Sequence, residues 1–301
     1  MENERQVILE EISRKFDNPF GYLFDETIPT LFTGGPYTHP VIGSRESVKA
    51  ISREDLHAHY RRYYAPENMF LNIVGNVDPE ETRRLVEEAF KDFQRPLDPW
   101  ENARDESEFA PPQDRTLVQD WNEAYFILAF PGPPADDLET VVRAELLEML
   151  LAGGRSSRLV NSLQEKKGLV SNIGAFFMTN RHAGPLLIFG TCKPEDLDEV
   201  KQEIFAELRA LADDGFNGRE EDRVRRMVMN SHLFSMETNA GRASTMGYSR
   251  VLLGDLSMVK EYDEQVHEIS RNDLLQFVEQ YLREDTASFL VTRREGNGSS
   301  S

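Results

Sequence analysis

One motif occurs twice in this chain, and the repeat constrains the fold more than any other feature of the sequence. Residues 51–56 read Ile-Ser-Arg-Glu-Asp-Leu, and residues 269–274, 218 positions later, read Ile-Ser-Arg-Asn-Asp-Leu. In both copies a Ser is followed three residues later by an Asp, a pattern typical of a capped helix start. An amphipathic stretch and then an apolar run follow, at 69–74 and at 287–292. The repeat predicts two copies of one α+β unit, each closing with a helix and a strand.

The second copy has the elements of a whole unit, whereas the first copy does not. Helical patterns at 4–16 and 221–236 share the offset of the repeat, so the first copy begins where the second has reached about residue 219. We therefore expect about one hundred residues of the first copy to be absent. In the second copy we expect strands at 115–121, 124–131, 170–178 and 185–192, and helices at 136–152, 156–166, 194–213 and within 219–266. This order predicts an antiparallel sheet of about five or six strands with helices packed on one face.

The repeat also divides the chain into regions. Residues 1–98 are expected to be the second half of a first domain, and residues 115–294 a second, homologous domain. Segment 99–114 carries prolines among acidic residues and is expected to be an exposed linker. The tail at 295–301 is expected to be disordered. The predicted chain is thus a domain and a half.

Charge and composition exclude several classes of protein. Acidic residues number 53 against 34 basic ones, for a net charge of −19, so neither nucleic acid nor anionic lipid is an expected partner. The single cysteine, Cys192, excludes an internal disulfide and a cysteine-based zinc cluster. No run approaches the roughly 18 apolar residues of a membrane span, and residues 1–20 have no signal-peptide core. The sequence indicates a soluble protein of the cytoplasm or the periplasm.

The first helix places two carboxylates on one side. Glu4 and Glu11 are seven residues apart, which brings them to nearly the same face at 3.6 residues per turn. Val7 and Ile8 lie between them on the same stripe. A carboxylate within an apolar stripe is costly unless it is paired or binds a metal, whereas one at the edge of the stripe reaches water. The spacing leaves both interpretations open, and the solvated one is the more common.

The segment from Glu4 to Glu11 resembles the one that supplies the third zinc ligand in insulinase/pitrilysin-type (inverzincin) zinc peptidases. The resemblance continues through 36–43, 51–56, 68–78 and 150–159 and covers residues 1–294. Within that family, the chain resembles a bacterial processing-peptidase-like subunit that is truncated at its N-terminus. The resemblance implies two homologous metallopeptidase units, each an antiparallel sheet backed by helices. It also implies that Glu11 is a zinc ligand and that Glu4 is a supporting carboxylate.

The other zinc ligands of that family are absent from this sequence. They are two His of an H-x-x-E-H helix whose Glu acts as general base. No histidine here has another four residues away, and the six are His39, His57, His59, His182, His232 and His267. The counterpart of that helix in the second copy lies near 145–150, where no His occurs. We therefore expect Zn²⁺ in the complete protein, and weak or absent zinc binding by this chain alone.

A second departure from the family concerns substrate binding. The family uses an Arg and a Tyr, seven residues apart, to stabilise the oxyanion, and the matching positions here are Gln164 and Ser171. A second homologous subunit is therefore expected to supply the Arg/Tyr pair. The resemblance implies a fragment of a heterodimeric zinc metalloendopeptidase that hydrolyses unfolded peptides in a chamber, the fragment being inactive by itself. The alternative is a catalytically inactive homologue that acts as a scaffold or partner subunit.

Other candidate sites have simpler explanations. His57 and His59 lie on different faces of a helix and make a poor metal pair. The glycine-rich run at 153–157 lacks a P-loop pattern and is expected to end one helix and cap the next. The basic run at 223–226 is expected to be a solvated helix face. Cys192 ends an apolar strand and is expected to be a buried small hydrophobe.

Overall fold

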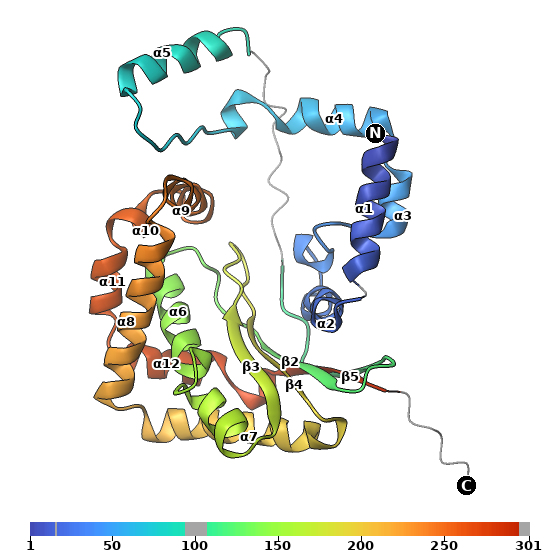
Figure 1. Cartoon of the computed structure of the whole chain (residues 1–301), viewed down its shortest axis with the longest axis vertical. Helices are drawn as coiled ribbons and strands as arrows, with labels where there is room; N and C mark the ends of the chain where they lie inside the picture. The colour runs from blue at the N-terminus through green and yellow to red at the C-terminus, as the bar shows by residue number, and fades with distance from the viewer. Residues whose placement is uncertain (16, 94–106, 295–301) are drawn as a thin grey trace.

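A computed structural model describes residues 1–15, 17–93 and 107–294, and these contain one five-stranded sheet (Figure 1). The strand order is β1-β5-β2-β4-β3. The β5–β2, β2–β4 and β4–β3 pairs are antiparallel, whereas β1 and β5 are parallel. The predicted α+β sheet is confirmed, except that its outer pair is parallel. The strands are β1 (Asp114–Val118), β2 (Ala124–Phe130), β3 (Val170–Phe177), β4 (Leu186–Cys192) and β5 (Ser288–Arg293).

Helices from the second half of the chain cover one face of the sheet. Helix α6 begins at Asp137, whose side chain accepts a hydrogen bond from the Thr140 N–H, and ends at Gly153. Its apolar side chains join Phe126, Leu128 and Phe130 of β2 in the main core. The helices of this half are α6 (Leu138–Ala152), the π-helix η4 (Val160–Lys166), α7 (Leu197–Asp214), α8 (Gly218–Ser235), α9 (Asn239–Leu252), α10 (Ser257–Lys260), α11 (Tyr262–Glu268) and α12 (Arg271–Tyr281), with short 3₁₀ turns at Pro194–Asp196 and Glu284–Thr286.

The other face of the sheet is covered by the N-terminal part of the chain. The side chains of Ile127 and Ala129, which alternate along β2 with those of the main core, pack against Leu23 and Leu31. Side chains from outside the expected second domain thus complete the core of that domain. Over the described residues no helix combines the length and apolarity that crossing a membrane requires. The N-terminal elements are α1 (Glu2–Lys15), α2 (Pro19–Thr27), η1 (Ile28–Leu31), η2 (Pro36–Thr38), α3 (Arg45–Ala50), α4 (Arg53–Tyr63), η3 (Pro66–Asn68) and α5 (Pro79–Phe90).

The strand predicted at 69–74 is wrong. The backbone of Met69 is extended, but the segment pairs with no other strand in the described chain. Its counterpart β5 is held between β1 and β2, and no such neighbours flank 69–74. Leu71 is 58% exposed, whereas Phe289, 218 residues later, is 7% exposed. An extended segment becomes a strand only when its N–H and C=O groups find partners, and here they do not.

The linker prediction is partly wrong. Residues 94–106 lie outside the described residues, but residues 107–113 pack on the molecule. The Phe109 ring stacks on Phe32 with centroids 5.0 Å apart, and the Ala110 N–H donates to the Leu31 carbonyl at 2.8 Å. The predicted tail at 295–301 also lies outside the described residues. The domain boundaries at 98 and 115 stay predictions.

The two copies of the sequence motif adopt the same local structure. Ser52 and Ser270 each form a capping box with the Asp three residues later. Just before each box, an arginine from another helix donates to the same two carbonyl positions at a helix end, and Arg5 donates to the Lys49 carbonyl as well. Arg5 donates to the carbonyls of Val48 and Ile51, at 2.7 and 2.9 Å. We call this arrangement the arginine clamp.

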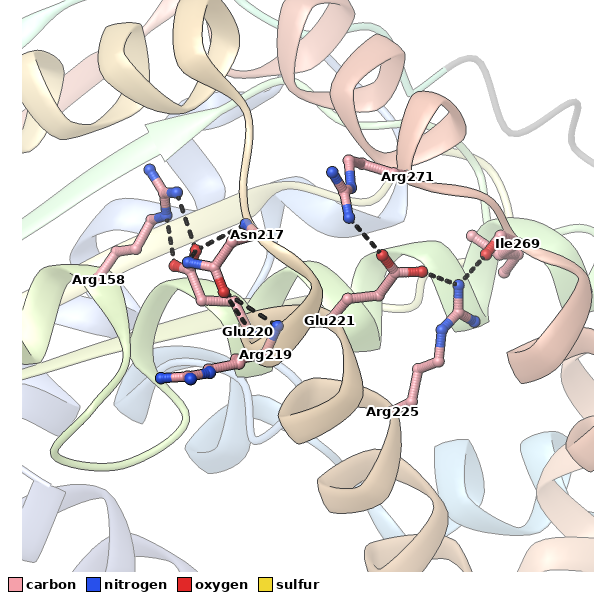
Figure 2. Close-up of polar contacts among 8 residues, drawn as sticks. All are labelled: Arg158, Asn217, Arg219, Glu220, Glu221, Arg225, Ile269 and Arg271. Carbon is pink, nitrogen blue, oxygen red and sulfur yellow. Dashed lines mark hydrogen bonds and ion pairs between the residues drawn. The ribbon is translucent and has the colours of Figure 1, made fainter.

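The second arginine clamp is made by Arg225, which donates to the carbonyl of Val266 and to that of Ile269, the latter drawn in Figure 2. Glu221 accepts from both Arg225 and Arg271 at 3.0 Å. The predicted solvated face at 223–226 is therefore wrong for Arg225, which is largely buried among helix ends, whereas Arg226 is exposed as predicted. The four carbonyls keep the 218-residue offset, but Arg5 and Arg225 are 220 apart. When Arg5 is matched to Arg225, each residue of helix α1 corresponds to the residue of helix α8 that lies 220 positions later.

Candidate functional site: helix α1 and the groove beside it

Helix α1 carries the two candidate carboxylates on its exposed side. Leu9 and Ile12 are buried against Val48 of α3 and fix the opposite side of the helix. Both Glu4 and Glu11 are exposed. The structure thus places them on one face, as their spacing predicts, and in contact with solvent. Neither is paired with the other, and only Glu4 lines a hollow.

The hollow is an apolar groove of about 800 Å³ between α1, α3 and α4. Its apolar lining includes Ile8 of α1, Val48 of α3 and Leu56 and Tyr60 of α4, and Glu4 lies on its wall. Large apolar side chains rarely form a continuous open surface in a finished core. The groove therefore leaves apolar side chains of α1, α3 and α4 open to solvent.

The second unit shows what covers the equivalent surface there. Ile51 is 39% exposed, but its counterpart Ile269 is 3% exposed. Leu56 is 49% exposed, but its counterpart Leu274 is 3% exposed. In the second unit α6 packs on α8, α11 and α12, and these correspond to α1, α3 and α4. The groove is thus the surface that α6 occupies in the second unit.

The second unit has a polar cavity of about 510 Å³ at the equivalent of the expected zinc site. Glu145 and Glu148 of α6 line it, together with Ser231 and His232 of α8. With the 220-residue offset, Ser231 is the counterpart of Glu11. The sequence holds a signal for this unpredicted cavity, namely two glutamates three residues apart within an apolar helix.

Burial governs the protonation of these cavity groups. It raises the pKa of Glu148 to about 8, and the nearby charge of Glu145 adds to that shift. Burial also raises the pKa of Glu145, which accepts a hydrogen bond from Tyr262. It lowers the pKa of His232, whose ring stacks on Tyr262 with centroids 3.9 Å apart. Burial therefore disfavours the charged form of all three groups.

The described residues do not form a zinc site by themselves. No three His, Cys, Asp or Glu side chains gather in the described part of the chain in a way that could hold a metal ion. Among the described residues, neither nearby histidine forms a site with Glu11. His57 lines the groove, which Glu11 does not line, and the His59 ring packs on Tyr63. Zinc coordination usually requires at least three protein ligands, so the part of the chain that the structure describes supplies too few.

The two degenerate substrate positions bond to each other. Gln164 Nε2 donates to the Ser171 carbonyl at 2.9 Å, and Ser171 Oγ donates to the Thr191 carbonyl at 3.2 Å. These groups connect the end of η4 to β3 and β4. Neither side chain has the charge or the length to replace the expected Arg and Tyr.

Two structural predictions for the second unit are confirmed. Cys192 is buried, and burial raises the pKa of its thiol to about 12, which makes it unreactive. Gly153 ends α6, and Gly154 has a φ of +90°, a conformation that favours glycine. The run at 153–157 is thus a helix end, as predicted. The further prediction that it caps the next helix is wrong, because η4 has no side-chain cap hydrogen bond and the Ser157 hydroxyl donates to the Gly154 carbonyl.

A sheet backed by helices, preceded by a second copy of its closing elements, defines a duplicated α+β domain, and comparison with known proteins identifies the family. The family described as Peptidase M16 inactive domain matches residues 50–228. This match covers more than half of the chain, so the chain belongs to the peptidase M16 family. The resemblance to zinc peptidases of this group is confirmed.

Relatives of known sequence agree with this assignment. An uncharacterized zinc protease of Rickettsia felis is 23% identical over 292 residues, which span 96% of this chain and 69% of the relative. An uncharacterized zinc protease of Mycobacterium leprae is 28% identical over 280 residues, spanning 90% of this chain and 61% of the relative. The chain therefore spans about two thirds of their lengths.

Solved structures show the same fold. A protease from Helicobacter pylori superposes with a TM-score of 0.87 at 21% identity, covering 97% of this chain and 71% of that protein. A peptidase M16 inactive domain from Pseudomonas fluorescens superposes with a TM-score of 0.84 at 19% identity, covering 97% and 70%. The agreement extends over both halves of the chain, including the N-terminal helices.

Proposed function

We propose that this chain contributes the third-ligand helix and the non-catalytic unit of a zinc metalloendopeptidase. Glu11 is the zinc ligand, and Glu4 is the carboxylate that supports it. The observation that carries the proposal is the uncovered groove beside Glu4, which matches the surface that α6 occupies in the second unit. A peptidase of the M16 family would place its H-x-x-E-H helix there.

The arginine clamps support the role of Glu11 through its position. With the clamps matched, Glu11 corresponds to Ser231, which lines a cavity together with Glu145 and Glu148 of α6. A helix seated in the groove as α6 is seated would therefore face Glu11. Glu4, seven residues earlier, is on the same face and already lines the groove.

The two His ligands would come from a segment outside this sequence, because no pair of His here has the required spacing. Bound zinc would supply a Lewis acid and lower the pKa of its water to about 7. The residues of this chain would hold one ligand position and bury the apolar back of the partner helix. The described residues do not fit zinc without that helix, so the chain by itself is expected to bind it weakly.

The substrate and the partner follow from the second unit. Gln164 and Ser171 bond to each other, so an Arg/Tyr pair would come from a second homologous subunit. Two subunits closing on each other would form a chamber for unfolded peptides. A peptide would bind there in an extended form by adding to a sheet edge.

A scaffold subunit without activity is the second candidate. It is favoured by the same Gln164–Ser171 contact and by the match to an inactive M16 domain. The exposed Glu4 and Glu11 speak against it, because a scaffold has no use for two carboxylates on that face. Zinc content and cleavage separate the two candidates.

The test co-expresses this chain with an H-x-x-E-H segment taken from a related zinc protease. Zinc per complex is measured by mass spectrometry, and cleavage is followed on an unfolded fluorescent peptide with an Arg/Tyr subunit present. We expect zinc in the complex and its loss in Glu11→Gln. Glu4→Gln should weaken zinc binding by about 10- to 100-fold, as changes beside metal ligands do.

Glu10→Gln is the matched control, because Glu10 is exposed on the same helix and pairs only with Arg14, at 3.7 Å. Equal zinc loss in Glu10→Gln and Glu11→Gln would contradict the proposed ligand. Zinc binding without cleavage would favour the scaffold subunit. A complex that forms but holds no zinc would exclude the metallopeptidase.

A further inference from the structure

We infer that the polar cavity of the second unit binds an organic cation, a guanidinium or primary ammonium group, between Glu145 and Glu148. The cavity lies where α6, α8, α9 and α11 meet. Its volume of about 510 Å³ is within the range of small-ligand sites. The inference concerns the second unit alone and does not depend on peptide hydrolysis by the first.

Each carboxylate in the cavity has an oxygen available to a ligand. Tyr262 donates to Oε2 of Glu145, and the backbone N–H of Phe177 donates to Oε1 of Glu148. The remaining oxygens, Oε1 of Glu145 and Oε2 of Glu148, receive no hydrogen bond from the described residues. An ionised carboxylate can accept about four hydrogen bonds, so both retain free acceptor capacity facing a hollow.

No cation within the described ranges neutralises either carboxylate. Arg143, on the same helix, instead pairs with Glu139 and with Asp273. Two largely buried carboxylates without a cation are costly in their ionised form. A bound guanidinium or ammonium group would offset that cost and satisfy the free oxygens at the same time.

The aromatic walls favour an organic cation over a metal ion. The His232 ring stacks on Tyr262 at an interplanar angle of 14°, and Tyr248 lines the cavity from α9. Aromatic faces attract ammonium and guanidinium groups. The hydroxyl of Ser231 can accept a further N–H. A metal ion would need a third ligand besides the two carboxylates. His232 lines the same cavity, but no three His, Cys, Asp or Glu side chains of the described residues are grouped so that they could hold a metal ion.

The experiment measures binding of N-acetyl-arginine amide to the full chain by calorimetry at pH 7.5. The matched ligand is N-acetyl-citrulline amide, which has nearly the same shape but no charge. We expect the arginine compound to bind and the citrulline compound not to bind. Either Glu145→Gln or Glu148→Gln should weaken binding at least about tenfold, the loss of a hydrogen bond to a charged group.

Glu139→Gln is the matched control, since Glu139 is exposed on the same helix and does not line the cavity. It should bind the arginine compound as the unchanged chain does. Spermidine and an unfolded arginine-containing peptide distinguish a free amine from a protein side chain as the source of the cation. If spermidine or the peptide binds more tightly than N-acetyl-arginine amide, and Glu145→Gln weakens that binding to the same extent, the inference is supported. The tighter ligand then identifies the source of the cation.

Three outcomes would overturn the inference. The first is no binding of any of the cations, the second is equal binding of the citrulline compound, and the third is a Glu145→Gln variant that loses Zn²⁺ or Ca²⁺ binding but not arginine. If a glutamine variant does not fold, the Ser244→Arg variant tests the site instead, because Ser244 lines the cavity and is exposed. Its tethered guanidinium should raise the Tm and abolish ligand binding, and unchanged binding would contradict the site.

Discussion

Ile51 and Ile269 stand at the same position in two copies of one structural unit, and they differ in what covers them. The carbonyl of each accepts a hydrogen bond from an arginine of a neighbouring helix. Ile269 is 3% exposed and Ile51 is 39% exposed. Helix α6 covers the second unit, and no described helix covers the first. The two residues therefore show the same packing surface in two states, covered by α6 in the second unit and uncovered by any described helix in the first.

This difference predicts unequal costs for the same substitution. Ile269→Ala should lower the free energy of unfolding by about 2–4 kcal/mol, because it leaves a cavity in the core. Ile51→Ala should cost less than about 1 kcal/mol, since its side chain is already exposed to water. Urea denaturation followed by circular dichroism measures both. Equal losses would mean that the groove is covered in solution.

The second arginine clamp should be a strong local contribution to stability. Arg225→Met leaves the carbonyls of Val266 and Ile269 without their donor, and unsatisfied buried groups cost about 1–3 kcal/mol each. Arg226→Met is the control, because Arg226 is exposed on the next position of the helix. We expect a clear drop in Tm for Arg225→Met alone. A similar drop for Arg226→Met would indicate that general charge on α8 is responsible.

The pKa of Glu148 predicts how stability depends on pH. Burial raises that pKa to about 8 from an ordinary value of 4.5, so the folded state holds a proton that the unfolded state releases. This contribution is complete below pH 4.5 and is lost as the pH rises towards 8, by up to about 1.4 kcal/mol per pH unit.

Glu148→Gln should remove this dependence, because glutamine has no proton to lose. The free energy of unfolding of the variant, measured in urea from pH 5 to 9, should fall less steeply than that of the unchanged chain. Glu139→Gln serves as the control and should keep the original slope. Identical slopes for Glu148→Gln and the unchanged chain would show that Glu148 is not buried as described.

The unpaired segment at 69–74 predicts self-association. Leu71 and Ile73 are exposed on a segment whose backbone pairs with no strand among the described residues, and unpaired backbone with exposed apolar side chains can pair with other chains. Light scattering across a concentration series should show oligomers. Leu71→Lys should reduce them, because a charged side chain opposes edge pairing.

Asn72→Lys provides a comparison within the same segment, since Asn72 donates to the Ala243 carbonyl at 2.7 Å and faces α9. It should disturb that contact while leaving the two apolar side chains in place. Oligomers that persist unchanged in Leu71→Lys would place the association elsewhere. The apolar groove beside α1 would then be the next surface to substitute.

The sequence by itself determined the elements whose signals are local. The capping boxes at Ser52 and Ser270 form within four residues, and both are where the repeat predicts them. The strands and helices of the second unit agree with the pattern to within a few residues, because alternation and helical periodicity reflect their burial. The seven-residue spacing of Glu4 and Glu11 also fixed their common face.

Tertiary structure decided everything that depends on a distant partner. Residues 69–74 and 287–292 read alike, but only the second segment has neighbouring strands, so only it forms a strand. Arg225 is in a basic run that looks solvated, yet its guanidinium reaches the end of α11. Glu145 and Glu148 became a buried pair only when α8 and α11 packed against α6. Hydrogen-bond partners and burial arise from chain segments far apart in sequence, and periodicity within one segment carries no record of them.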